Sequence, residues 1–146
     1  MADGVFNIAR GRIREKIING GAKFGVMLLK AAEADSTLRD YDNLSTLLAA
    51  AGNTECDFTN YARKTSLQPT QSVDDANEQA LADVADLTWA SAGGAANNDV
   101  KKLIVYFEES ASDSGRFPCT FHDFVATTDG TDLTAQIASG GFYQST

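Results

Sequence analysis

The single histidine of this chain lies close in sequence to a possible nucleophile and a possible acid. Cys119, His122 and Asp123 are residue types that can act as a nucleophile, its general base and the group that orients the base. On a β-strand, however, residues three apart point to opposite faces, and so do direct neighbours. We expect this segment to be a strand, in which His122 is satisfied by local hydrogen bonds. The sequence therefore predicts no catalytic site and no enzyme.

Two acidic clusters offer oxygen atoms that a hard cation could use. One contains Asp74, Asp75, Asn77 and Glu78, and the other is the Asp-Gly-Thr-Asp stretch at 129–132. Neither has the ligand order and central glycine of a calcium loop. We interpret both as turns and expect no metal site.

The remaining candidates for cofactor chemistry are equally incomplete. Gly93 and Gly94 are followed by neither a P-loop lysine nor the G-x-G-x-x-G pattern of a dinucleotide site. Cys56 and Cys119 are too few and too far apart in sequence for a disulfide scaffold or a zinc site, and whether they approach each other stays open. The sequence thus predicts no cofactor.

The elements that would position these residues are mostly short strands. The strand predicted at Val100–Glu109 is apolar on both faces, which is typical of a central strand. A second strand is predicted at Phe117–Val125, with Pro118 near its beginning. Asp129-Gly130, placed between 125–127 and 133–137, predicts a hairpin.

Further elements are predicted on the N-terminal side of these strands. Lys23–Lys30 is a short apolar run that suits a buried strand. Apolar residues at helical spacing predict a helix over about residues 42–51, with Asp42 as its N-cap and Gly52 as its stop. Short strands are expected at Leu81–Val84 and Leu87–Ala90, with Trp89 in the core.

These elements predict a mainly β fold. We expect a β-sandwich or jelly-roll-like body with a short N-terminal helix and the further short helix at about 42–51. The chain of 146 residues has the length of one domain. We divide it into an N-terminal basic helix or arm at 1–22 and a β-rich body at 23–146.

The N-terminal segment supports two interpretations. Between Val5 and Asn19, Ala9, Ile13 and Ile17 recur four apart, which favours a helix that ends at the glycines following Asn19. The same residues also alternate with charged ones, which is typical of an extended arm. We favour the helix.

Charge is distributed unevenly along the chain. Residues 1–30 contain six Lys or Arg and two Asp or Glu, a net charge of +4, whereas the rest of the chain carries −12. A basic segment on an acidic body could bind an acidic surface of a neighbouring protein, or it could be a solvated helix face. The acidic body argues against nucleic acid as the main partner.

No feature predicts membrane insertion or export. The longest apolar run, Phe24–Leu29, is far shorter than the ~20 residues needed to cross a bilayer. The N-terminus lacks the basic-then-apolar pattern of a signal peptide, so synthesis in the cytoplasm is the expectation.

An ordered set of segments resembles a group of small structural proteins of tailed bacteriophages. The resemblance spans residues 6–145 and rests on TLRDYDNL at 37–44, NTE at 53–55, FTNYARK at 58–64, VDDAN at 73–77, LTW at 87–89, KLIVY at 102–106, HDF at 122–124 and TTDGTDLTA at 127–135. It implies a capsid cement, or decoration, protein. Such a protein is β-rich, lies on the outer capsid surface of the virion, and binds the major capsid protein and itself as a homodimer or homotrimer. The resemblance transfers no active-site residues.

A decoration protein needs contacts that repeat symmetrically over the shell. The two ends of the chain are our candidates for this assembly interface, with simple packing on the chain's own body as the alternative. The candidate residues are Phe6, Ile8, Arg10, Arg12, Arg14, Phe142 and Tyr143.

Two other functions compete with decoration of the shell. A head–tail connector or tail structural protein could have the same small β-rich fold. A module that binds host-surface glycan would need an exposed aromatic side chain, and Trp89 is the only tryptophan.

Overall fold

The computed structural model describes residues 3–10, 23–138 and 141–145. It confirms the predicted class, because 43% of the chain is strand and 13% is helix, arranged as a β-sandwich-like body with short helices. The strands are β1 (Asp3–Val5), β2 (Phe24–Ala31), β3 (Thr54–Glu55), β4 (Lys64–Leu67), β5 (Thr70–Asp74), β6 (Gln79–Asp83), β7 (Leu87–Trp89), β8 (Asp99–Phe107), β9 (Phe117–Thr127), β10 (Leu133–Ala135) and β11 (Tyr143–Ser145). The helices are α1 (Asn7–Arg10), α3 (Asp35–Leu38), α4 (Leu44–Ala49) and the 3₁₀ turn η1 (Asp113–Gly115).

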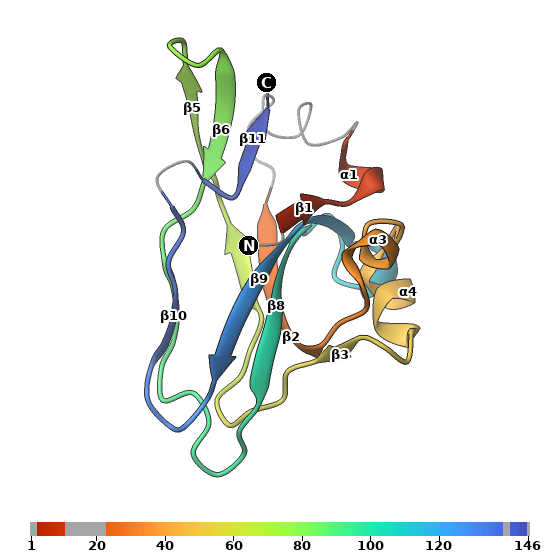
Figure 1. Cartoon of the computed structure of the whole chain (residues 1–146), viewed down its shortest axis with the longest axis vertical. Coiled ribbons are helices and arrows are strands. Elements are labelled where there is room, and N and C mark those ends of the chain that lie inside the picture. Colours follow the sequence, from red (N-terminus) through yellow and green to blue (C-terminus); the bar gives the residue numbers. More distant parts are fainter. Residues whose placement is uncertain (1–2, 11–22, 139–140, 146) are drawn as a thin grey trace.

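The main sheet is antiparallel and has the order β1-β9-β8-β2-β3, with β4 also paired to β2. The predicted central strand is β8, which is hydrogen-bonded to β2 on one edge and β9 on the other. Its side chains from Lys102 to Phe107 are buried on both faces. Figure 1 shows why, since β10 lies on one side of the β8–β9 pair and α3 and α4 lie on the other. A strand covered on both faces needs the continuous apolar run that identified it in the sequence.

The core is built on aromatic contacts between distant segments. Phe24 of β2 packs against Phe107 of β8 and against Phe142, with ring centroids 4.8 and 5.4 Å apart. Trp89 is 2% exposed, as predicted, and its Nε1 donates to the carbonyl of Ala62 at 2.8 Å. Each of these rings removes a large apolar area from water, and this burial is the main stabilisation of such a body.

The predicted short helix is α4, with its ends placed differently. Its N-cap is Asn43 and not Asp42, because the Asn43 side chain accepts a hydrogen bond from the Thr46 amide at 2.9 Å. It ends at Ala49, before Gly52, where the side-chain amide of the buried Asn53 donates to the Leu47 carbonyl at 3.1 Å in place of the next helical hydrogen bond.

The Asp129-Gly130 stretch forms a turn, as predicted, but the hairpin prediction is wrong. The strands on its two sides do not pair with each other, since β9 pairs with β8 and β1 while β10 pairs with β7. Gly130 has φ +96° and its amide donates to the Ala92 carbonyl at 2.8 Å. This contact fixes the turn beside the β7–β8 connection, so the chain crosses to the second layer instead of returning along β9.

The N-terminal segment is only partly the predicted helix. Residues 3–5 form the strand β1, paired to Thr120–His122 of β9, and the helix within the described part is the single turn α1. The strand forms here because Gly4 leaves room for the ring of Phe121 directly beside it. The remainder of the predicted helix or arm, residues 11–22, lies outside the described residues.

An arginine links three parts of the fold. Arg63 donates to both carboxylate oxygens of Glu55, each at 2.7 Å, and to Asp113 of η1 at 2.7 and 3.1 Å. The Arg63 side chain is 18% exposed. Its guanidinium lowers the pKa of Asp113. Two bidentate contacts in a partly buried site hold the β3 region to the β8–β9 connection.

Candidate interaction surfaces

His122 lies on β9 near one edge of the main sheet, where β9 pairs with the edge strand β1. Its Nε2 is 3.0 Å from Thr120 Oγ1, and its Nδ1 is 3.6 Å from a carboxylate oxygen of Asp3. Burial lowers the pKa of His122, and the nearby Asp3 carboxylate only partly opposes this effect. The prediction of local hydrogen bonding is confirmed.

The Cys119 thiol is not activated as a nucleophile. Its side chain is fully buried, and burial raises the pKa of its thiol well above the ordinary value. A thiol that stays protonated is a poor nucleophile. Cys119 also stands at a register shift of the β8–β9 pairing, between Val105↔Thr120 and Tyr106↔Pro118. Both Cys56 and Cys119 are buried free thiols.

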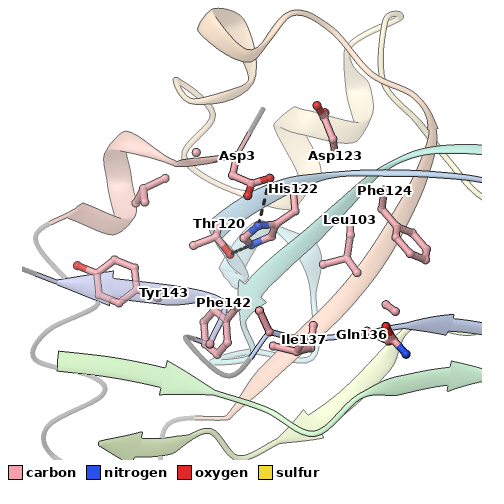
Figure 2. Close-up of a pocket in the computed structure, with 15 residues that line it drawn as sticks. Asp3, Leu103, Thr120, His122, Asp123, Phe124, Gln136, Ile137, Phe142 and Tyr143 are labelled. Carbon is pink, nitrogen blue, oxygen red and sulfur yellow. Dashed lines mark hydrogen bonds and ion pairs between the residues drawn. The ribbon is translucent and has the colours of Figure 1, made fainter. Parts of the chain in front are cut away.

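A groove with a volume of about 560 Å³ lies beside His122 (Figure 2). We call it the terminal groove, because both ends of the described chain line it. Asp3, Gly4 and Val5 come from β1, and residues 141–143 come from the C-terminal end. Its other lining residues are Leu103, Thr120, His122, Asp123, Phe124 and 135–138. Figure 2 shows an apolar floor that includes Ile137 and Phe142, with Asp3 and His122 at one end.

The structure places the predicted interface residues in different environments. Phe6 is 0% exposed and packs edge-to-face on Phe121, with ring centroids 5.3 Å apart, so its side chain belongs to the chain's own core. Ile8 is half-buried. Phe142 is 6% exposed at the floor of the groove, and Tyr143 is half-buried at its side. Arg12, Arg14 and the side chain of Arg10 lie outside the described residues.

A second feature, the β5–β6 hairpin, was not recognised as a surface in the sequence. Figure 1 shows β5 and β6 extending beyond the ends of the main-sheet strands. In β5, every side chain from Thr70 to Val73 is exposed, and Val73 is 75% exposed. The available signal was the polar stretch between Pro69 and the acidic cluster, which has too few apolar residues to mark a strand.

The acidic cluster at the tip of this hairpin is a turn, as predicted. One Asp74 oxygen accepts hydrogen bonds from the amides of Ala76 and Asn77 at 3.1 and 3.2 Å, and the other accepts from the Asn77 side chain at 2.7 Å. The hydrogen bond from the Asn77 side-chain amide is the main cause that lowers the pKa of Asp74. The Asp74 carboxylate therefore closes the hairpin turn.

The described residues contain no group of three or more His, Cys, Asp or Glu side chains placed to hold a metal ion. No helix among them is long and apolar enough to cross a membrane.

No protein-family model, curated protein or solved structure matches this chain.

Proposed function

We propose that this protein is a bacteriophage virion structural protein that decorates the capsid. In this role it binds the outer shell through the terminal groove and the basic segment that follows β1, and it stabilises contacts between major capsid subunits. It works as a homo-oligomer on the outer capsid surface and catalyses no reaction. The resemblance to phage structural proteins supports a role in the virion. The terminal groove supports the choice of binding surface.

The observation that carries the proposal is the convergence of both chain ends on one groove. Residues 3–5 and 141–143 are far apart in the sequence but line the same 560 Å³ space. Gln136 and Asp3 are exposed at this groove, while Phe124, Ile137 and Tyr143 are half-buried in it. An apolar floor with a polar margin is the usual composition of a protein-binding surface.

The uneven distribution of charge along the chain also supports capsid binding through the terminal groove. The basic residues of segment 1–30 follow directly from the strand that lines the groove, whereas the rest of the chain carries −12. A basic segment that follows in sequence from a strand lining the groove suits an acidic patch on a capsid subunit.

One pair of variants tests the groove. Gln136→Arg places a long charged side chain in the terminal groove, and we expect it to weaken binding to undecorated capsids by about tenfold or more. Gln68→Arg makes the same change at an exposed position that does not line the groove, and it is expected to bind like the wild type. Equal affinities of the two variants, measured by co-sedimentation with capsids, would count against this face.

The basic segment is tested separately. We expect Arg12→Gln combined with Arg14→Gln to weaken capsid binding and to reduce its dependence on salt concentration, because fewer charges are then paired with the shell. The midpoint of thermal unfolding should stay unchanged. Capsid binding with an unaltered salt dependence would exclude a role for these arginines.

Trp89 provides no exposed platform for a sugar ring, because only 2% of it is exposed. No observation in the described residues favours the glycan-binding alternative over decoration. A connector or tail protein differs from a decoration protein in the number of copies that each virion holds.

A further inference from the structure

The outer edge of β5 is unpaired among the strands that the structure describes. β5 is the terminal strand of the three-stranded sheet β11-β6-β5, and its five pairs with β6 run from Thr70↔Asp83 to Asp74↔Gln79 without a register shift. In an antiparallel ladder, alternate residues direct their amide and carbonyl groups away from the paired neighbour. β5 therefore presents a regular row of free hydrogen-bonding groups.

Proteins usually protect such an edge with lysine, proline, a bulge or an inward-pointing charge. Residues Thr70 to Val73 contain none of these devices. Pro69 stands immediately before the strand, and Asp74 is held by the turn through its hydrogen bonds to Ala76 and Asn77. Pro69 and the Asp74 turn therefore limit β5 at its two ends. The backbone edge of the four residues between them can accept another strand.

The hairpin also has little support from its own chain. All four side chains from Thr70 to Val73 are exposed, whichever face of the ribbon they occupy. Among the described residues, Val73 is one of two large hydrophobic side chains that are highly exposed, at 75%. β6 is held on its other edge by β11, so β5 is the strand of this sheet that gains least from burial within its own chain.

We propose that β5 is a dimerisation edge, where the β5 strand of a second copy of this chain adds in antiparallel orientation. The interface is isologous, so the same residues of both copies meet across a two-fold axis. The sheets of the two copies then join into one continuous sheet of six strands, since each contributes β11, β6 and β5. This assigns a surface to the self-association that the proposed function includes.

The sequence of β5 is self-complementary in the register centred on Ser72. In this register Ser72 meets Ser72 of the second copy, Gln71 meets Val73, and Thr70 meets Asp74. No two like charges stand opposite each other. The two Val73 side chains lie diagonally across the axis on the same face, so each exposed valine stands beside the second copy's strand.

Charge and shape permit a second copy to approach at this edge. The chain carries a net charge of −8, so two bodies repel when they approach broadly. The segment 70–73 has no charged side chain and extends beyond the main sheet (Figure 1), so the two bodies can stay apart while the hairpins pair. The rigid Asp74 turn reduces the conformational entropy that pairing costs.

Pairing of five residues makes a smaller interface than the roughly 800 Å² per partner of a stable complex. We therefore expect a reversible dimer, with a dissociation constant on the order of 100 µM for the free protein. Sedimentation equilibrium of the full chain over increasing concentration should fit a monomer–dimer equilibrium. A chain that remains monomeric at about 1 mM, or that forms trimers, overturns the proposal.

Two matched variants locate the interface. Val73→Lys places a charge beside the two-fold axis and is expected to weaken dimerisation at least tenfold. Val125→Lys changes charge equally at the other highly exposed valine, 77% exposed on β9, and should leave the dimer within about twofold of the wild type. Both reduce the net negative charge, so loss of dimer only in Val73→Lys cannot come from net charge. Equal effects overturn the assignment to β5.

A cysteine on the axis gives an independent measurement. Ser72→Cys brings two thiols together across the axis, and oxidised glutathione should convert them to a disulfide-linked dimer with release of two reduced glutathione molecules. Ser114→Cys is an equally exposed control on η1. The native thiols are buried and should not react. Cross-linking of Ser72→Cys no faster than that of Ser114→Cys contradicts pairing in this register.

The test distinguishes this inference from the proposed function, because dimerisation is measured without capsids. A monomer that decorates capsids overturns the β5 interface and the proposed self-association, and it leaves the decoration role standing. A dimer that binds no capsid supports the β5 interface and counts against decoration.

Discussion

At the scale of single residues, the structure separates groups that the sequence placed together. The segment around His122 was predicted to be a strand with local hydrogen bonds, and the structure confirms both. The contact of His122 with Asp3 was not predictable, because Asp3 reaches it only through the pairing of β1 with β9. Local alternation can show which side chains diverge, whereas contacts between distant segments depend on strand pairing that no local pattern encodes.

His122 gives a prediction about the pH dependence of stability. Burial lowers its pKa, the Asp3 carboxylate partly opposes this effect, and the positive charge of Lys102 adds to it. Because the folded pKa is below the ordinary value near 6.5, the unfolded chain binds the proton more tightly. The stability that depends on neutral His122 is therefore complete above about pH 6.5 and is lost as the pH falls through the folded pKa.

We expect the His122 ring signals in NMR to titrate below pH 6.5, and His122→Gln to flatten the decrease in unfolding free energy just below that pH. Because this is the only histidine, the signals need no assignment. A pKa at or above 6.5 would contradict the burial argument.

Arg63 gives a prediction about stability. Arg63→Ala leaves Glu55 and Asp113 without their shared cation in a partly buried site, so we expect a loss of about 2 kcal/mol in the free energy of unfolding. Lys30→Ala, which removes the pair with the exposed Asp57, should change it little. Urea unfolding measures both. Similar small losses in the two variants would show that the Arg63 contacts contribute no more than a surface ion pair.

At the scale of elements, the apolar patterns of β2, β8 and α4 were readable, because each buries a continuous or periodic set of side chains. The hairpin at Asp129-Gly130 was not, since the turn residues are correct but the following strand finds its partner in β7. Turn chemistry specifies a reversal of the chain, and the burial of Ala135 with Leu87 and Trp89 decides which strand lies beside it.

The strand β1 gives a prediction at this scale. A side chain at Gly4 would overlap the ring of Phe121, so Gly4→Ala should loosen β1 from β9. We expect exchange of the Phe6 amide, which donates to the Cys119 carbonyl at 3.1 Å, to accelerate about tenfold or more. The central amides of β8 are the internal control and should keep their protection. Unchanged exchange at Phe6 would mean that the Phe121 ring moves aside at no cost.

The burial of Phe6 and Ala9 shows that this part of the N-terminal segment is not a free arm. Both are 0% exposed, so the first residues are part of the body and cannot be removed as a free arm without loss of core packing. The sequence allowed a helix or an arm because its spacing fits both, and only the contact of Phe6 with Phe121 shows that this part is packed.

At the scale of the whole molecule, composition and patterning predicted the mainly β body correctly, since they depend on averages over many residues. They did not predict the terminal groove or the exposed β5 edge. The groove forms where residues 3–5 meet residues 141–143, and the edge exists because of where the sheet β11-β6-β5 ends. Both are consequences of topology, and both are the surfaces through which we propose that the protein assembles.

The number of copies bound to each undecorated capsid at saturation tests the decoration role most directly. A decoration protein occupies every equivalent site on the shell, so we predict saturation at hundreds of copies per capsid, together with a higher temperature of capsid disruption. Saturation at a few copies on a single vertex would indicate a connector, and no binding at all would contradict the account.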